Sequence, residues 1–416
     1  MFIEVEGGRR AAGELTVQGA KNAVLPMIAA TVLCGQTMIL ENCPRIQDVY
    51  SMTAVLKDIG AQVRWDEDKL VIDTSSIEKY EIIQKEVGEL RASILFLGSI
   101  LGRRGEAGIR MPGGCSIGAR PIDYHLGAFE KLGVMVCRED EVIRCVVKEA
   151  GEELVRLPYP SVGATENVIL YAVLRKGSTT LCNAAKEPEI IELCELLRKM
   201  GAKVSGDGSG CIRIEGVKEL HGTSFRLKTD RIAFLTYAAM AAGTGGNAYL
   251  RVCGETFDAE KSYLEKTGCR LQCDKEGIRI NGEEGLRAIP YIRTEPYPGF
   301  PTDAQSLFLA LLSKAYGESI IEESVFENRF LVASQLRKMG ADIEVAGQRA
   351  CIRGVTRLHG ETVQATDLRS GAALLLAGVM AEGKTVVGNC RLILRGYESP
   401  VENIQDLGLQ ARYICG

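Results

Sequence analysis

The strongest constraint on the fold is a phrase that the chain repeats six times: an amphipathic helix pattern, a glycine and then an alternating strand pattern. The clearest pair is Leu-Arg-Lys-Met-Gly-Ala, which occurs at 197–202 and again at 336–341. The spacings between successive glycines, 73, 68, 67, 72 and 68 residues, are regular enough to indicate six similar structural modules. The six glycines are Gly60, Gly133, Gly201, Gly268, Gly340 and Gly408.

Each copy predicts a helix with one core-facing side. Val49, Met52, Leu56 and Ile59 share a helical face, as do Ile190, Cys194, Leu197 and Met200. The glycine that follows can adopt the left-handed conformation that closes the last helical turn. The residues after it alternate as a hairpin, for example 204–214 around the glycine-rich turn 206–210. Each module therefore ends in β-structure.

A second repeated phrase begins with glycine and ends with asparagine. It spans 35–42, 177–183 and 383–389, and it predicts a turn out of a helix followed by a strand. Together the two phrases describe a repeated α/β module. A chain of 416 residues built from six such modules is expected to form two domains or one large barrel-like unit.

Composition excludes several classes of function. Hydrophobic residues make up 46% and charged residues 25%, as in ordinary globular proteins, and a net charge of −4 argues against nucleic acid as a partner. Glu4 and Glu6 stand where a signal peptide would be basic, and no stretch approaches the roughly 18 apolar residues of a membrane span. We expect a soluble cytoplasmic protein without membrane insertion, whose oligomeric state the sequence does not indicate.

The fourteen cysteines are spread along the chain, many in apparent strands and helices. Cys34, Cys182, Cys194 and Cys351 are placed like small hydrophobic residues in a reducing compartment. Because there is no C-x-x-C pair and the three histidines are dispersed, no metal site is predicted. Apart from Cys115, the cysteines are expected to be buried and unreactive.

Residues 111–121, Met-Pro-Gly-Gly-Cys-Ser-Ile-Gly-Ala-Arg-Pro, predict a mobile active-site loop. Pro112, Gly113 and Gly114 disfavour regular structure and allow positive φ angles. The guanidinium of Arg120 would hold an anion and lower the pKa of the Cys115 thiol. From this loop alone, an ordinary surface loop with an incidental cysteine remains an alternative.

The same loop resembles the catalytic loop of the UDP-N-acetylglucosamine enolpyruvyl transferases, also called UDP-N-acetylglucosamine 1-carboxyvinyltransferases. The resemblance covers nearly the whole chain, because seven other segments are similar to that family's motifs in the family's order. They are 19–23, 91–93, 161–165, 300–303, 326–330, 365–369 and 395–398.

The resemblance implies the arrangement of the six modules. It is an inside-out α/β barrel of two domains, each built from three repeated βαβαββ-type units. Residues 21–229 would form the first domain with the Cys115 loop. Residues 1–20 and 230–416 would form the second domain.

The resemblance also implies a reaction that needs no cofactor. The enolpyruvyl group of phosphoenolpyruvate is transferred to the 3′-hydroxyl of UDP-N-acetylglucosamine with release of phosphate, the first committed step of peptidoglycan synthesis. Guanidinium groups suit the anionic substrate because they bind carboxylate or phosphate through two parallel hydrogen bonds. Lys21, Arg120 and Arg395 would grip the phosphate of phosphoenolpyruvate, Arg329 and Arg369 its carboxylate, with Asn22 beside them.

The catalytic set implied by the resemblance is Cys115, Asp303, Lys21, Arg120 and Arg395. Cys115 would be the general acid or would assist product release, and Asp303 would be the general base or would position the sugar hydroxyl. The backbone amides of 161–164 could cradle phosphate oxygens. The expected contacts of UDP-N-acetylglucosamine are Asn22, Arg91, Arg120, Pro121, Ile122, Asp123, Ser161, Val162, Gly163, Asp303 and Val325.

Some positions depart from the family pattern. Ala233 and Phe234 stand where glutamate and a small residue are usual, Leu394 precedes Arg395, and Ser399-Pro400 interrupts a charged helix start. They touch supporting positions, and so they fit a slower or specialised paralogue better than an inactive one.

Three alternatives remain open. A shikimate-type enolpyruvyl transferase shares the architecture, although the Cys115 loop and segment 161–163 favour the sugar-nucleotide branch. A non-catalytic sugar-nucleotide-binding paralogue would bind without turnover. A cysteine hydrolase fits worst, because the nearest histidine to Cys115, His125, lies outside the loop and resembles a residue that frames the nucleotide site.

Overall fold

The computed structural model describes residues 1–84, 90–112, 122–148, 151, 153–254 and 257–414. The chain divides into two compact domains. The first domain comprises residues 19–227, and the second comprises 1–18 and 228–416, each without the residues outside those ranges. Each domain is described by itself.

The described part of the first domain contains three four-stranded sheets. Their strand orders are β14-β3-β5-β4, β6-β7-β9-β8 and β10-β11-β13-β12. The strands are β3 (Thr37–Glu41), β4 (Gln62–Asp66), β5 (Lys69–Asp73), β6 (Glu81–Ile82), β7 (Glu106–Arg110), β8 (Val134–Glu139), β9 (Val142–Val147), β10 (Leu154–Arg156), β11 (Ser178–Cys182), β12 (Lys203–Ser205), β13 (Cys211–Glu215) and β14 (Ser224–Arg226).

The described part of the second domain repeats this arrangement with β2-β15-β17-β16, β18-β19-β21-β20 and β22-β23-β1-β24. The strands are β1 (Phe2–Glu6), β2 (Glu14–Thr16), β15 (Asn247–Arg251), β16 (Arg270–Cys273), β17 (Gly277–Asn281), β18 (Tyr291–Arg293), β19 (Glu318–Glu322), β20 (Asp342–Ala346), β21 (Arg349–Arg353), β22 (Thr362–Gln364), β23 (Lys384–Gly388) and β24 (Gln410–Ile414).

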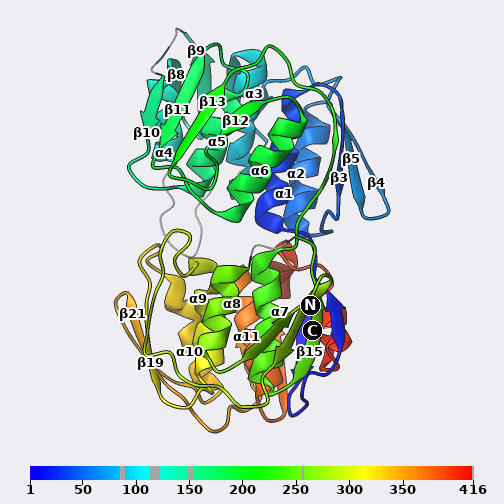
Figure 1. Cartoon of the computed structure of the whole chain (residues 1–416), viewed down its shortest axis with the longest axis vertical. Helices are drawn as coiled ribbons and strands as arrows, with labels where there is room; N and C mark the ends of the chain where they lie inside the picture. Colours follow the sequence, from blue (N-terminus) through cyan, green and yellow to red (C-terminus); the bar gives the residue numbers. More distant parts are fainter. Residues whose placement is uncertain (85–89, 113–121, 149–150, 152, 255–256, 415–416) are drawn as a thin grey trace. The chain divides into compact units, whose positions relative to one another are not determined.

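All six of these sheets share one pairing pattern. The first strand in each order runs parallel to the second, and the remaining pairs are antiparallel. The prediction of six similar α/β modules is therefore confirmed. Two edge strands are far in sequence from the strands that they pair with. In the second domain, β2 comes before residue 19 and pairs with β15. In the first domain, β14 is the last strand and pairs with β3. The N-terminal β1 lies between β23 and β24, which brings the two chain ends close together (Figure 1).

One helix of each module is buried on all sides. These inner helices are α1 (Lys21–Ala30), α3 (Leu95–Arg104), α5 (Val162–Ala172), α7 (Arg231–Gly243), α9 (Thr302–Leu312) and α11 (Leu368–Met380). Within their own domains α1 packs on α3 and α3 on α5, while α7, α9 and α11 pack on one another. The sheets instead alternate buried and exposed residues, as along β13, so they have one solvent face. Helices thus lie inside and sheets outside (Figure 1), and no sheet among the described strands closes into a barrel.

The other helices lie further out. They are α2 (Gln47–Asp58), α4 (Asp123–Lys131), α6 (Pro188–Lys199), α8 (Asp258–Lys266), α10 (Ala333–Lys338) and α12 (Pro400–Asp406). Short 3₁₀ helices are η1 (Thr31–Leu33), η3 (Arg91–Ile94), η4 (Arg329–Val332) and η5 (Cys390–Arg395). The residues predicted to form the core faces of α2 and α6 are buried.

The left-handed glycine predicted at the end of a helix is present in all six modules. The six glycines that follow the outer helices have φ between 74° and 112°, a region that a side chain disfavours. The second phrase is built the same way: its three glycines and Asn42, Asn183 and Asn389 all have positive φ. They flank β3, β11 and β23, which is the strand that the phrase predicts.

Candidate active site

Six of the thirteen predicted site residues that the structure describes lie in the first turn of an inner helix. Lys21 and Asn22 open α1, Val162 and Gly163 open α5, Asp303 is the second residue of α9 and Arg369 the second of α11. Unpaired N–H groups and the helix dipole make such termini favourable for anions. The positive end of the helix dipole destabilises a cation placed there unless an anion accompanies it. These positions therefore suit ligands that carry negative charge.

In the first domain, Lys21 is paired with a carboxylate that the sequence did not single out. Its Nζ lies 2.8 Å from Oδ2 of Asp48, the second residue of α2, and both side chains are almost fully buried. Asn22, next to Lys21, is partly exposed. Asp48 offsets the charge of Lys21 and limits its rotamers, so the ammonium group is held at the beginning of α1.

The predicted nucleotide-binding residues surround a buried hydrogen-bond network. The Asn167 side chain of α5 donates to Nδ1 of His125 at 2.9 Å and to the carbonyl of Ile94 at 2.9 Å, and it accepts from the Gly98 N–H at 2.9 Å. It therefore ties α4, α5 and the segment that begins at Arg91. Burial, and secondarily the charge of Arg91, lowers the pKa of His125 to about 3. His125 is neutral, and because Nδ1 accepts, its proton is on Nε2.

The loop before α5 is shaped by the same histidine. Ser161 caps α5 by accepting from the Ala164 N–H at 3.4 Å. A Cβ on Gly163 would lie 3.1 Å from Cε1 of His125, so a larger residue there would push against a buried ring. Ile122 is buried, whereas Asp123 is exposed and pairs with Arg138 at 2.6 Å. Asp123 is thus committed to a surface ion pair.

In the second domain, Asp303 joins two arginines. Its Oδ1 accepts from Nη2 of Arg329 at 2.6 Å, and its Oδ2 accepts from Nη2 of Arg369 at 2.8 Å. Both guanidinium groups are buried, and Nη1 of Arg329 also lies 3.8 Å from Asp367. Burial opposes the charge of Arg369, but the Asp303 carboxylate outweighs it, and the pKa of Arg369 is raised.

Arg369 is held by its own helix. Asp367 caps α11 by accepting from the N–H groups of Arg369 and Ser370, and Ser370 completes a capping box. Tyr397 is buried nearby and hydrogen bonds with Thr236 at 2.7 Å. Burial raises the pKa of Tyr397, although the charge of Arg369 acts in the opposite direction. Arg395, two residues before Tyr397, ends η5 and is partly exposed.

Val325 is positioned by a buried carboxylate that sequence reasoning missed. Glu323, fully buried, accepts through Oε1 from the N–H groups of Val325 and Phe326 at 2.8 and 3.0 Å and from Thr294 Oγ1 at 2.9 Å. Its Oε2 accepts from Thr302 Oγ1 at 2.9 Å. Because Thr302 precedes Asp303, Glu323 links the Val325 loop to the beginning of α9. An acidic residue directly after a strand is not a specific signal of burial, so nothing in the sequence pointed to Glu323.

Three predicted site residues, Cys115, Arg120 and Pro121, lie outside the described residues.

The departures from the family pattern have a structural explanation in part. Ala233 and Phe234 are buried in α7, and Phe234 stacks on Phe257 with ring centroids 4.6 Å apart. The beginning of α7 is thus packed by an aromatic pair.

The prediction that the cysteines apart from Cys115 are buried was wrong for seven of the twelve that the structure describes. Cys211 and Cys273 are exposed, and Cys34, Cys182 and Cys351 are only partly buried, whereas Cys194 is buried as expected. For the cysteines on strands, the reason is the two-residue period of a strand. Cys211 falls on the outward positions of β13, where buried and exposed residues alternate.

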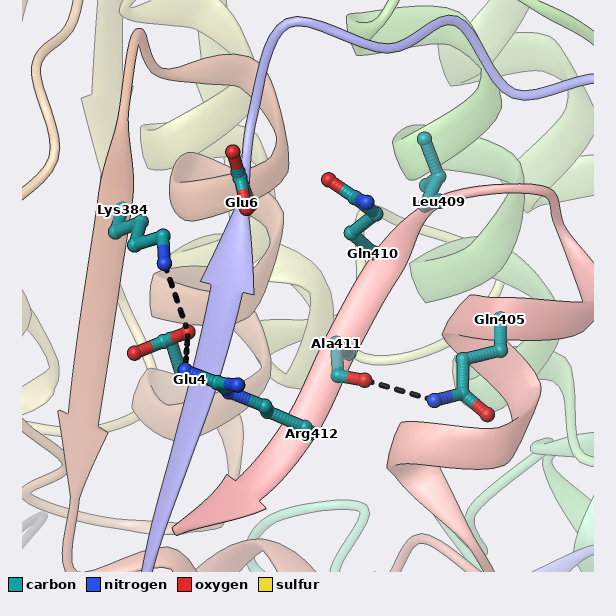
Figure 2. Close-up of a pocket in the computed structure, with 8 residues that line it drawn as sticks. All are labelled: Glu4, Glu6, Lys384, Gln405, Leu409, Gln410, Ala411 and Arg412. Atoms are coloured by element: carbon teal, nitrogen blue, oxygen red, sulfur yellow. Dashed lines mark hydrogen bonds and ion pairs between the residues drawn. The ribbon is translucent and has the colours of Figure 1, made fainter.

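A surface hollow of about 280 Å³ lies apart from these residues, in the second domain (Figure 2). It is lined by residues of β1, β23, β24 and α12, and in it Glu4 lies 2.9 Å from Arg412 and 3.7 Å from Lys384. It contains none of the predicted site residues, so we do not assign the function to it.

Within the described ranges, no group of three or more His, Cys, Asp or Glu side chains could hold a metal ion. In the same part of the chain, no helix has both the length and the apolar character that crossing a membrane requires.

The fold is that of the enolpyruvyl transferases. The crystal structure of the enolpyruvyl transferase NikO from Streptomyces tendae superposes with a TM-score of 0.88 at 24% identity, over 99% of this chain and 98% of that one. EPSP synthase from Acinetobacter baumannii superposes with a TM-score of 0.78 at 17% identity, over 99% of each chain. Identities this low establish the fold class alone.

Sequence comparison gives the particular family. The EPSP synthase (3-phosphoshikimate 1-carboxyvinyltransferase) profile matches residues 5–404. UDP-N-acetylglucosamine 1-carboxyvinyltransferase 2 of Caldanaerobacter subterraneus subsp. tengcongensis is 44% identical over 98% of both chains. The enzymes of that name from Granulibacter bethesdensis and Thermotoga maritima are 42% and 40% identical, over 100% and 99% of this chain and 99% and 98% of theirs. The chain therefore belongs to the UDP-N-acetylglucosamine 1-carboxyvinyltransferase family and is an enzyme.

Proposed function

We propose that this enzyme transfers the enolpyruvyl group of phosphoenolpyruvate to the 3′-hydroxyl of UDP-N-acetylglucosamine and releases phosphate, in the first committed step of peptidoglycan synthesis. The observation that carries the proposal is the Asp303 carboxylate held between Arg329 and Arg369. The names of relatives that are 40–44% identical over nearly the full chain support the same reaction. They favour it over the shikimate-type reaction. We place the enzyme in the cytoplasm, as the sequence analysis expects.

Different charged residues would bind the carboxylate and the phosphate of the anionic enol ester. A guanidinium has five N–H donors, so a single contact with Asp303 does not use the whole of Arg329 or Arg369. We assign the substrate carboxylate to these two residues, because a planar guanidinium matches a carboxylate. Lys21, Arg120 and Arg395 would bind the phosphate.

The sugar nucleotide would be held by the remaining predicted residues. Asn22 and Asp303 would orient the sugar. Arg91, Ser161 and Gly163 lie around the buried His125–Asn167 network, which gives the nucleotide a rigid support. The further contacts that we propose are Arg120, Pro121, Ile122, Asp123, Val162 and Val325, although Asp123 would first have to leave Arg138.

The chemistry is addition followed by elimination. A proton goes to the methylene carbon of phosphoenolpyruvate, and the sugar 3′-oxygen attacks the neighbouring carbon. The carbon–oxygen bond to phosphate then breaks as the new methyl group loses a proton, which restores the double bond of the enolpyruvyl group. Asp303 either takes the hydroxyl proton or accepts a hydrogen bond from it. Two guanidinium groups already orient both carboxylate oxygens, which supports the positioning role. The arginines would stabilise negative charge as it develops.

Cys115 would donate the proton or assist product release. A thiol has a pKa nearer to neutral than a hydroxyl, so Cys115→Ser should lose most activity. A carboxylic acid can also donate a proton, so Cys115→Asp should stay active. Cys115→Asp should in addition resist a small anionic epoxide that resembles phosphoenolpyruvate, whereas the parent enzyme should be inactivated by it. Full activity in Cys115→Ser would remove the thiol from the mechanism.

The test of the proposed function is phosphate release with each substrate alone and with both together. We expect phosphate only when both are present, because the attacking hydroxyl belongs to the sugar nucleotide. Equal release without the sugar nucleotide would contradict the proposal. Binding of UDP-N-acetylglucosamine without any turnover would instead favour the non-catalytic paralogue, and turnover with shikimate 3-phosphate the shikimate-type reaction.

A further inference from the structure

Two thiols outside the proposed active site face each other on the outer sheet of the third module. Cys182 ends β11 and Cys211 begins β13, and the two are register partners in an antiparallel pair. Their Sγ atoms are 3.6 Å apart. Cys211 is exposed and Cys182 is partly buried, so reagents in solvent have access to the pair.

The backbone around the pair has the geometry that a cross-strand disulfide requires. The Cys211 N–H donates to Ser209 Oγ at 3.2 Å, and the Cys182 carbonyl accepts from the Leu157 N–H at 3.0 Å. The two cysteines therefore do not exchange backbone hydrogen bonds with each other. In such non-hydrogen-bonded pairs the Cα atoms are about 4.5 Å apart. That separation falls within the range observed for disulfides, roughly 4.4–6.8 Å.

We propose that Cys182 and Cys211 are a site of reversible oxidation, at which a low-molecular-weight disulfide converts the two thiols to an intramolecular disulfide. The thiolate of Cys211, the more exposed of the two, attacks one sulfur of the small disulfide and releases one thiolate. The thiolate of Cys182 then attacks Sγ of Cys211 and releases the second. Two cysteine thiols are oxidised, one small disulfide is reduced to two thiols, and the two cysteine protons pass to the released thiolates.

The local charges affect the rate of the first step. The hydrogen bond with Cys182 raises the pKa of Cys211, while the positive charge of Arg156 acts in the opposite direction. Arg156 is the register partner of Cys182 on β10. Because the thiolate is the nucleophile, the reaction should be faster at pH 8 than at pH 6.

The bond would join strands at the point where the chain turns toward α6. Asn183, which follows Cys182, has a φ of 56° and donates to the Leu157 carbonyl at 2.9 Å. The Ala185 N–H then donates to Thr165 Oγ1 at 3.0 Å. These contacts hold the end of β11 in place. Because the two Sγ atoms already lie 3.6 Å apart, little movement beyond side-chain rotation is needed to bring them to about 2.05 Å.

The experiment is peptide mapping of the full-length protein. Reduced protein is incubated with oxidised glutathione at pH 8, free thiols are blocked, and peptides are identified by mass spectrometry with and without a final reduction. Cys273 is the matched control, because it is exposed on a strand but its register partner is Ile278. We expect a Cys182–Cys211 linked peptide that reductant removes, and a glutathione adduct at Cys273.

The variant Cys182→Ser provides the second measurement. With its partner removed, Cys211 should carry a glutathione adduct as Cys273 does. The proposal is overturned if, in the parent protein, Cys182 and Cys211 are recovered unlinked, either free or as separate glutathione adducts, under conditions that modify Cys273. Because none of these readouts depends on enolpyruvyl transfer, the result is independent of the proposed function.

Discussion

Asp303 and Arg369 are 66 residues apart in the sequence, and Nη2 of Arg369 donates to Oδ2 of Asp303 at 2.8 Å. Each is the second residue of an inner helix, α9 and α11, and these helices pack against each other. Equivalent positions of two successive modules therefore meet. The repeated architecture aligns the first turns of its inner helices, and a carboxylate on one and a guanidinium on the next form the centre of the second domain's charged cluster.

Asp303→Asn should lower the turnover of enolpyruvyl transfer, by roughly 10²-fold or more if Asp303 transfers a proton. The amide still accepts a hydrogen bond but is a far weaker base. Phosphate release measures the effect, with Asp342→Asn, an exposed carboxylate of the same domain, as the control. An unchanged rate in a folded Asp303→Asn protein would remove Asp303 from the mechanism.

Glu323→Ala should lower the free energy of unfolding by about 2–4 kcal/mol, because it leaves the buried donors of Thr294, Val325 and Phe326 without their acceptor. Glu323→Gln retains an acceptor oxygen and should cost less, about 1 kcal/mol. Denaturant unfolding measures both. Glu318→Ala, on the exposed side of β19, the strand that Glu323 follows, should change little. Equal stability of all three variants would show that Glu323 does not support this loop.

His125 should make the protein less stable as the pH falls. Burial keeps the folded-state pKa at about 3, below the unfolded value of about 6.5. Between these values the unfolded chain binds a proton that the folded protein does not, so stability falls by about 1.4 kcal/mol per pH unit on acidification and levels off above pH 6.5.

Denaturant unfolding between pH 4 and 8 tests this contribution. His125→Gln should show a smaller loss on acidification than the parent protein, whereas His221→Gln, at an exposed site, should follow the parent. A parent-like pH slope in His125→Gln would assign the acid sensitivity to other groups.

Arg231→Met should be strongly destabilising, by about 3–5 kcal/mol, since Arg231 Nη1 pairs at 2.8 Å with the fully buried Glu260 carboxylate. The double variant Arg231→Met with Glu260→Leu should recover most of that loss, because no buried charge is left unpaired. Unfolding curves of the two single variants and the double variant measure the coupling. As a control, Arg251→Met removes only exposed ion pairs and should have little effect. Additive losses in the double variant would contradict the pairing.

Local sequence determined the modules. The helical faces of α2 and α6, the left-handed glycines at the six helix ends and the hairpin of β12 and β13 were all predicted, since each depends on residues that are neighbours in the chain. The family motifs gave Asp303, Arg329 and Arg369 as site candidates, and the structure brings these three together. Whether they bind the proposed substrates stays a prediction.

Tertiary structure decided which distant residues become partners. The pairing of β14 with β3, the carboxylates Asp48 and Glu323 and the facing thiols of Cys182 and Cys211 have no local signal. Periodicity in a sequence shows which side of an element is apolar, but the partner of a strand edge or a buried charge depends on the packing of segments that are far apart in the chain. The same limit explains the wrong prediction for the cysteines, because a residue type alone does not show which side of a strand will face solvent.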